Sequence, residues 1–297
     1  MNRVALIAVW LTMMGLLSAQ QPVSCPGPLT EAQLMDLVKN QVPEKRLHLI
    51  VQTCGVRFAL SDPVKSRLRA AGASADLLEK IRAHAPKMAT TVAGTKKVNP
   101  KDGLTYVWIP PGTFMMGCSP GDSECDADEK PARPITIPRG FWIGQTLVTQ
   151  EAYGRVMGQK PSSFRGDRRP LEQVDWNDTQ AYCRAVGMRL PTEEEWEYAA
   201  RAGNTSSRYG SLDAVAWYNG NSGYQTHDVG QKQPNTWGLY DMLGNVYEWT
   251  ASNYNANTKV LRGGAWYNSP RYVRVSSRVE YDPGYRPNFA GARCVGE

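Results

Sequence analysis

The sequence contains few of the residues that multi-histidine metal centres and nucleic-acid sites need. Three histidines occur in 297 residues, and the wide separation of His48, His84 and His227 argues against a multi-histidine metal centre. The net charge is +6, yet no long basic run occurs, so nucleic-acid binding is not indicated. Phenylalanine is scarce (5), whereas tryptophan (9) and tyrosine (14) are plentiful. Rings with a polar handle suit half-buried sites and binding surfaces.

Long apolar runs are absent except at the N-terminus. A positive start at residues 1–3 precedes an apolar run at residues 4–17 and a small-residue exit at residues 18–20. This order predicts a signal peptide over residues 1–20. The run is short for a membrane span, so we expect a secreted or periplasmic protein with no stable span after signal removal. Because Cys25 lies well beyond the run, a lipoprotein site is the weaker alternative.

An even number of cysteines favours disulfide pairing in an exported chain, although the sequence alone leaves the connectivity open. The six residues are Cys25, Cys54, Cys118, Cys125, Cys183 and Cys294. Cys25 and Cys54 flank the N-terminal region, and Cys118 and Cys125 lie on one loop, so their locations favour these two pairs. The alternative for the first pair is that both thiols stay free.

Residues 28–86 are predicted to form a small helical module. Thr30 followed by Gln33 is a capping-box start, and further helix starts are expected at Pro43, Pro63 and Ser74. The pattern is an approximate repeat of helix, turn and helix. We expect a stabilising or spacing module, with docking to a partner protein as the alternative. Residues 87–102 are small, polar and aperiodic, which predicts a linker.

Residues 103–297 are predicted to form an irregular α+β domain with few short strands and helices. Strand candidates occur up to residue 146, and capped helices are expected from Thr149, Asn177 and Thr192. Residues 118–130 form an acidic loop without the glycine and glutamate of an EF-hand, so a solvated loop is expected. Beyond Gly203, regular signals fade for about ninety residues, a length that normally signals function.

Four sequence motifs follow one another along this domain. They are WIPPGTFMMG at residues 108–117, MRLPTEEEWEYA at 188–199, GLYDMLGNVYEW at 238–249 and RGGAW at 262–266. Together they resemble the formylglycine-generating enzyme family, also called the sulfatase-modifying factor domain, over roughly two-thirds of the chain. The resemblance implies an irregular fold related to C-type lectins, with bound calcium. It also implies a bridge between Cys183 and Cys294.

The resemblance implies a chemistry whose ligands are missing from this chain. Formylglycine-generating enzymes hold copper with two cysteines that follow the glycine pair five positions apart. Here Asn268 and Val273 occupy those positions, and Ala265 replaces the serine after the glycines. An amide and an isopropyl group do not replace thiolates as copper(I) ligands. We therefore expect no copper and no formylglycine-generating activity.

A calcium site is the metal site that the resemblance still implies. Its ligands would be the side chains of Asp241 and Glu248 and the carbonyl groups of Gly244 and Val246. Oxygen ligands in an irregular turn suit calcium. The alternative is that both acids are solvated or pair with arginines.

The C-terminal segment is the candidate ligand-binding surface. It combines aromatic anchors with polar and arginine side chains, a composition typical of binding loops and similar to the variable segment of diversified lectin-fold proteins. The candidate residues are Trp266, Tyr267, Asn268, Arg271, Tyr272, Arg274, Arg278, Tyr281 and Tyr285. The alternative is that the rings pack as core and the arginines pair with acids.

Three functions follow from these observations. The first is an exported family member that binds a protein or small-molecule ligand through the C-terminal surface. The second is an oxidoreductase or other enzyme that uses the same pocket, lined by Arg262, Asn268, Tyr272, Arg274 and Arg278, although no nucleophile–base pair is visible. The third is a structural component that docks through the helical module.

Overall fold

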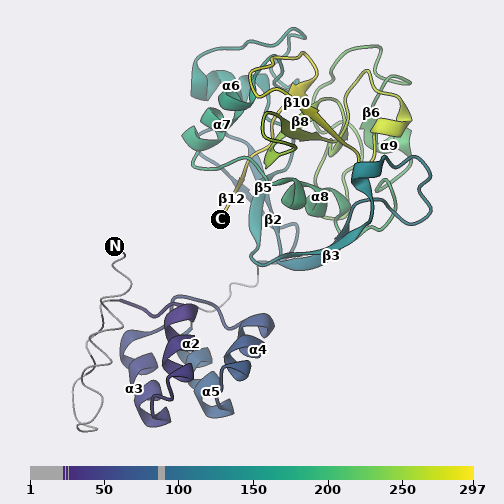
Figure 1. The fold of residues 1–297 in the computed structure, drawn as a ribbon. Coiled ribbons are helices and arrows are strands. Elements are labelled where there is room, and N and C mark those ends of the chain that lie inside the picture. Colours follow the sequence, from purple (N-terminus) through teal and green to yellow (C-terminus); the bar gives the residue numbers. More distant parts are fainter. Residues whose placement is uncertain (1–22, 24, 26, 86–90) are drawn as a thin grey trace. The chain divides into compact units, whose positions relative to one another are not determined.

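The computed structural model describes residues 23, 25, 27–85 and 91–297, which fall into two units (Figure 1). The first unit comprises Met1–Thr90 and the second comprises Thr91–Glu297. The predicted signal peptide at residues 1–20 lies outside the described residues. None of the described helices is long and apolar enough to cross a membrane.

The first unit contains a four-helix module among its described residues. The helices are α2 (Glu31–Lys39), α3 (Glu44–Cys54), α4 (Asp62–Ala70) and α5 (Ala75–His84). Thr30 and Gln33 form the expected capping box, and the Ser74 hydroxyl accepts from the Leu77 amide. Helix α2 packs against α4 and α3 against α5, which buries one face of each helix around Leu34 and Leu68. The apolar residues at helical spacing therefore pack into the core of the module itself.

The second unit contains many short elements. Its helices are α6 (Gln150–Met157), α7 (Trp176–Ala185), α8 (Glu193–Arg201) and α9 (Leu212–Val215), with 3-10 turns η1 (Ala127–Glu129) and η2 (Pro270–Tyr272). The first strands are β1 (Lys96–Val98), β2 (Thr105–Ile109), β3 (Gly112–Met116), β4 (Arg133–Ile137) and β5 (Phe141–Gly144). The later strands are β6 (Ala216–Trp217), β7 (Leu243–Gly244), β8 (Tyr247–Asn253), β9 (Lys259–Arg262), β10 (Arg278–Tyr281), β11 (Ala290–Gly291) and β12 (Val295–Gly296).

Two four-stranded sheets organise this unit. One has the antiparallel order β1-β2-β5-β12, and the other has the order β10-β9-β8-β11, in which β11 runs parallel to β8. The pairs β3-β4 and β6-β7 complete the strands of the described residues. Strand β1 lies inside residues 87–102, which the sequence pattern assigned to a linker. A three-residue edge strand carries too little apolar periodicity to be recognised in advance.

The core of the second unit forms around large aromatic side chains. Trp196 of α8 packs with β2, β5 and residues 239–243, while Trp249 of β8 packs with Tyr153 of α6 and Tyr182 of α7. The irregular α+β fold is as expected. Gly244 shows why the backbone needs glycine here, because its φ is 76° and a Cβ atom would lie 2.3 Å from the Trp217 carbonyl oxygen.

All six cysteines are paired in the structure, as Cys25–Cys54, Cys118–Cys125 and Cys183–Cys294. These are the predicted pairings. The third bridge lies in the core, where it joins α7 to the segment before β12. It therefore ties the middle of the domain to its last strand.

Candidate functional site

The predicted ligand-binding residues occupy three different environments. Arg271, Tyr272 and Tyr285 are exposed, the two tyrosines by 37% and 47%. Four others are half-buried: Trp266, Tyr267, Arg278 and Tyr281. Asn268 and Arg274 are buried, so the structure places these two predicted residues beneath the surface.

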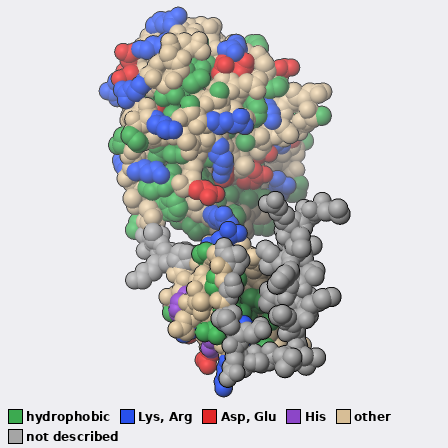
Figure 2. Space-filling model, turned by 90° about the vertical axis from the view of Figure 1, so that its left-hand side faces the viewer, with side chains coloured by type: hydrophobic (Ala, Val, Ile, Leu, Met, Phe, Trp, Pro, Cys, Tyr) green, Lys and Arg blue, Asp and Glu red, His purple; other side chains and the backbone are tan. Residues whose placement is uncertain are grey.

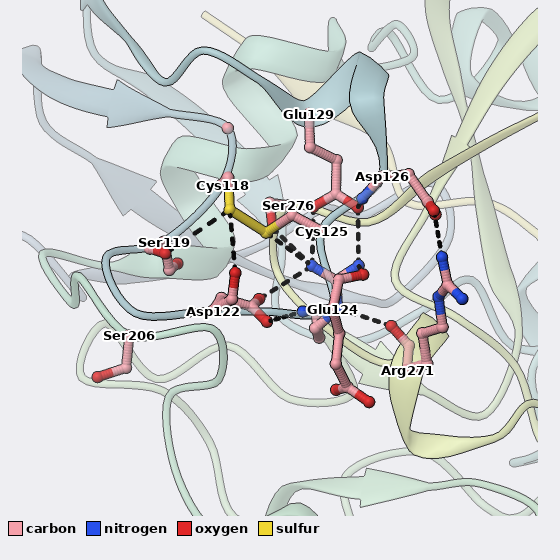
Figure 3. Close-up of a disulfide and its surroundings, with 12 residues drawn as sticks. Cys118, Ser119, Asp122, Glu124, Cys125, Asp126, Glu129, Ser206, Arg271 and Ser276 are labelled. Carbon is pink, nitrogen blue, oxygen red and sulfur yellow. Dashed lines mark hydrogen bonds and ion pairs between the residues drawn. A yellow bond between two sulfur atoms is a disulfide. The ribbon is translucent and has the colours of Figure 1, made fainter.

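Arg274 is fully buried, and its guanidinium group pairs with Asp122 and Glu129. Figure 3 shows these two acids beside the Cys118–Cys125 disulfide. The Nη atoms of Arg274 donate to both oxygens of Glu129 at 2.7 and 2.8 Å and to Asp122 at 3.0 Å. Burial alone would raise the pKa of Glu129, but hydrogen bonds from Arg274 and Ser276 outweigh it and lower that pKa. Arg274 is thus a structural cation.

The acidic loop at residues 118–130 is the counterpart of the arginines in the C-terminal segment. Arg271 pairs with Asp126, and Arg278 lies 2.9 Å from Glu193 and 3.8 Å from Asp128. The sequence pattern predicted a solvated loop, but the structure pairs the acids of this loop with arginines. Its carboxylates neutralise a positive segment more than a hundred residues away, which only the fold brings beside it.

The remaining aromatic residues form a connected cluster around Phe289, a residue that the sequence analysis did not single out. Tyr267, Tyr281 and Tyr285 all contact Phe289, with ring centroids 5.0, 5.5 and 6.3 Å away. Tyr281 and Tyr285 also stack on each other at 5.5 Å. We call Trp266, Tyr267, Tyr281, Tyr285 and Phe289 the aromatic surface.

The positions of the two copper cysteines are filled by packing groups. The Asn268 side-chain oxygen accepts from the Ala265 amide at 2.7 Å, and Val273 is fully buried. Beside them, burial raises the pKa of the Tyr247 phenol, while a hydrogen bond with Asn268 opposes the rise. Asn268 therefore closes its own turn and contacts the buried Tyr247 phenol.

Asp241 retains an unused oxygen in a buried position. It is 1% exposed, and its Oδ2 accepts from the Gly230 amide at 2.7 Å, whereas Oδ1 has no partner. Burial, the largest cause, raises the pKa of Asp241 to about 6. A buried carboxylate oxygen without a donor fits a cation ligand.

Glu248, the other predicted calcium side chain, is already neutralised. Its oxygens accept from the Trp196 indole at 2.9 Å and from Arg293 at 3.0 to 3.2 Å. Arg293 also donates to the carbonyl oxygens of Gly144, Tyr240 and Asp241. No cluster of three His, Cys, Asp or Glu side chains that could hold a metal occurs in the described residues. The donor set therefore fits calcium at Asp241 better than at Glu248.

Arg262 of the RGGAW motif is also structural. It is fully buried, pairs with Glu197 of α8, and donates to the carbonyl oxygens of Ser276 and Ser277 at 2.8 and 3.1 Å. The expectation that Arg262 lines a pocket is wrong. Glu197 also binds Arg201 at 2.8 Å and the Gly117 amide at 2.8 Å, so one carboxylate joins three segments.

Two buried carboxylates, Glu197 and Glu172, and the buried Arg293 were not predicted from the sequence. Glu197 lies between the aromatic residues Trp196 and Tyr198, and its i,i+4 spacing to Arg201 was the only local signal. Arg293 carries no local signal of burial. Glu172 is fully buried with an unpartnered Oε2, and burial raises its pKa to about 7.

The fold and the site define a class of protein: an irregular α+β domain held by buried ion pairs, with tyrosines on its C-terminal segment and every cysteine oxidised. The chain belongs to the family described as the sulfatase-modifying factor enzyme 1-like domain, whose model matches residues 91–297.

Named relatives of the chain differ in their described roles. It is 31% identical over 222 residues to "Chaperone protein LppX" of Paenibacillus barcinonensis, covering 52% of this chain and 79% of that protein. It is 36% identical over 155 residues to "Inactive C-alpha-formylglycine-generating enzyme 2" of Bos taurus, covering 42% of this chain and half of that protein. Against "Formylglycine-generating enzyme" of Streptomyces coelicolor, identity is 26% over 301 residues, covering 72% and 96%.

Solved structures agree with this assignment of the fold. PvdO from Pseudomonas aeruginosa is 27% identical, with a TM-score of 0.63 over 69% of this chain and 98% of that one. Treponema denticola variable protein 1 is 28% identical, with a TM-score of 0.59 over 68% and 98%.

The triple role of Glu197 gives a stability prediction. We expect Glu197→Gln to lower the free energy of unfolding by about 3–5 kcal/mol, because it leaves the buried charges of Arg201 and Arg262 uncompensated. Urea unfolding followed by tryptophan fluorescence measures this change. The matched control Glu194→Gln, on the same helix, should change it by less than about 0.5 kcal/mol. A loss below about 1 kcal/mol in Glu197→Gln would contradict the role assigned to this carboxylate.

Proposed function

We propose that this protein is an exported, non-catalytic member of its family, at least with respect to formylglycine formation, and that it binds a ligand or partner protein. The binding face is the aromatic surface with the exposed neighbours Tyr272 and Arg271. The observation that carries the proposal is the replacement of the copper thiolates by Asn268 and Val273 beside exposed tyrosines. Three disulfides support an oxidising, non-cytoplasmic compartment, which we assign as extracellular or periplasmic.

Binding through this surface rests on its exposed rings and its neutralised charges. Tyr285 and Tyr272 expose large ring areas to solvent, and such rings act as rigid anchors at low entropic cost. Arg271 and Arg278 are paired with acids, so local net charge is low. The bovine relative, which is named as inactive, supports a role without formylglycine chemistry for this domain. The similar Treponema protein is named a variable protein.

The alternative is an oxidoreductase of the formylglycine-generating type. Its support is the 26% identity to the Streptomyces enzyme. Against it, Arg262 and Arg274 are committed to buried ion pairs, and all six cysteines are in disulfides. The pocket envisaged for such an enzyme therefore loses two of its polar groups and has no thiolate for copper(I).

A direct assay separates these two functions. The purified protein, supplied with Cu(I) and oxygen, should convert none of a sulfatase-motif peptide and consume no oxygen above the buffer rate. The reason is that copper(I) requires soft thiolate ligands, which are absent. Mass spectrometry of the peptide and an oxygen electrode provide the two readouts. Peptide conversion that depends on added copper would refute the non-catalytic assignment.

The binding surface is tested on glycan and peptide arrays. We expect the wild-type protein to give hits that the variant Tyr272→Ala/Tyr281→Ala/Tyr285→Ala loses by at least tenfold, since losing aromatic anchors costs more than about 1–2 kcal/mol in binding free energy. Tyr224→Ala is the control, because Tyr224 is 67% exposed and lies outside this surface. An array without hits, or hits that survive the triple substitution, would contradict the proposed surface.

We also propose one calcium ion, held by the Asp241 carboxylate and the carbonyl groups of Gly244 and Val246, while Glu248 stays paired with Arg293. Calcium would neutralise the buried carboxylate, whose unused oxygen supports the site. Without metal, the raised pKa means that folded Asp241 binds its proton more tightly than the unfolded chain does. Stability of the metal-free protein should therefore fall as the pH rises from about 4 to about 6.

Calcium should consequently raise the midpoint of thermal unfolding at pH 7 by several degrees, and a chelator should reverse the rise. In Asp241→Asn we expect no calcium response and a metal-free protein that is more stable than wild type by about 1–3 kcal/mol, because the ionised buried carboxylate is gone. Asp167→Asn, an exposed site, is the control. A wild-type midpoint that calcium leaves unchanged would exclude the ion.

A further inference from the structure

The three disulfides differ in how they are exposed and in how much chain they close. Cys183 and Cys294 are fully buried in the core, whereas Cys118 is half-buried, as are Cys25 and Cys54 of the first bridge. The Cys118–Cys125 bridge spans a sequence separation of 7, against 29 and 111 for the other two. Because a short loop restricts the unfolded chain least, this bridge contributes least to the stability of the fold.

A buried cation lies beside the second sulfur of this bridge. Nη1 of Arg274 is 3.5 Å from Cys125 Sγ, and the side chain of Arg274 is fully buried. This Nη1 group, which also donates to Glu129 and Asp122, is placed to donate to a Cys125 thiolate, and a thiolate stabilised in this way leaves faster in thiol–disulfide exchange. The arrangement is polarised, because Cys118 is the sulfur that a nucleophile reaches and Cys125 is the better leaving group.

We propose that Cys118–Cys125 is a modification site for an external dithiol reductant, and that its opening loosens the binding surface. A thiolate of the dithiol attacks Cys118 Sγ, the Cys118–Cys125 bond breaks, and Cys125 leaves as a thiolate beside Arg274. The second thiolate of the dithiol then displaces Cys118 from the mixed disulfide. The dithiol ends as a disulfide, and its two electrons and two protons are transferred to the cysteines.

The same arginine connects the bridge to the exposed part of the C-terminal segment. Arg274 Nε donates to the Arg271 carbonyl oxygen at 2.6 Å, and its Nη2 donates to the Glu124 carbonyl oxygen at 3.2 Å. Arg271 pairs in turn with Asp126. Opening the bridge therefore leaves the loop held to η2 by the ion pairs and hydrogen bonds of Arg271 and Arg274. Calling η2 part of a binding surface rests on the proposed function, whereas the chemistry of the bridge does not.

The first test is the order in which the cysteines become reduced. The full-length folded protein is treated with graded concentrations of dithiothreitol, its thiols are alkylated, and the labelled cysteines are mapped by mass spectrometry. Cys118 and Cys125 should be labelled at concentrations at least tenfold below those that label the other four. Simultaneous labelling of all three pairs, or earlier labelling of Cys25 and Cys54, would overturn the proposal.

The second test concerns the role of Arg274. Reduction of the bridge should slow by about three- to tenfold in Arg274→Gln, because the leaving thiolate loses its cation. The matched control is Arg208→Gln, which removes another cation beside the loop, 3.8 Å from Glu124, and should leave the rate within about twofold. An unchanged rate in folded Arg274→Gln would overturn the leaving-group assignment. If circular dichroism shows that this variant is unfolded, the labelling order in the wild-type protein decides.

Hydrogen exchange measures the structural consequence without any ligand. After selective reduction, the backbone N–H groups of residues 119, 121–126 and 271–274 should exchange at least tenfold faster, while those of β8 and β9 stay unchanged. If these amides exchange at the same rates in the oxidised and the reduced protein, the coupling is refuted. Because this readout needs no binding partner, its failure is distinguishable from failure of the array experiment.

Discussion

Buried arginine–carboxylate pairs are the interaction on which this domain depends. Arg262 with Glu197, Arg274 with Glu129 and Arg293 with Glu248 all lie in the interior, and each arginine also donates to a backbone carbonyl group of a distant segment. A long irregular chain leaves many carbonyl groups outside helices and sheets, and these need donors. A guanidinium group, with five donors in a fixed plane, supplies several at once. The arginines therefore replace part of the hydrogen bonding that regular strands would provide.

This use of charge also separates scaffold from surface in the C-terminal segment. The arginines that the sequence analysis listed as binding residues form ion pairs with the acidic loop and with α8. The tyrosines remain at or near the surface. Figure 2 shows one face of the molecule with basic, acidic and apolar side chains interspersed. Recognition by the proposed surface would consequently depend on ring contacts and hydrogen bonds more than on net charge.

The sequence predicted the fold well where local signals exist. Capping residues such as Thr30, Ser74 and Thr192 marked helices, and the four ordered motifs identified the family. The burial of Arg274 was not predictable, because its partners Asp122 and Glu129 lie about 150 residues earlier and only tertiary structure joins them. The same holds for Glu248, whose pairing with Arg293 is invisible to spacing rules. Ligand binding and calcium remain predictions, since neither follows from packing alone.

The last residues of the domain supply a strand to each of its two main sheets, β11 beside β8 and β12 beside β5. Neither sheet can be completed until this stretch has been synthesised and delivered. A chain that is still being made therefore lacks one edge of both sheets. The two sheets are therefore completed late and at nearly the same time. Formation of the Cys183–Cys294 disulfide can then covalently fix the completed domain.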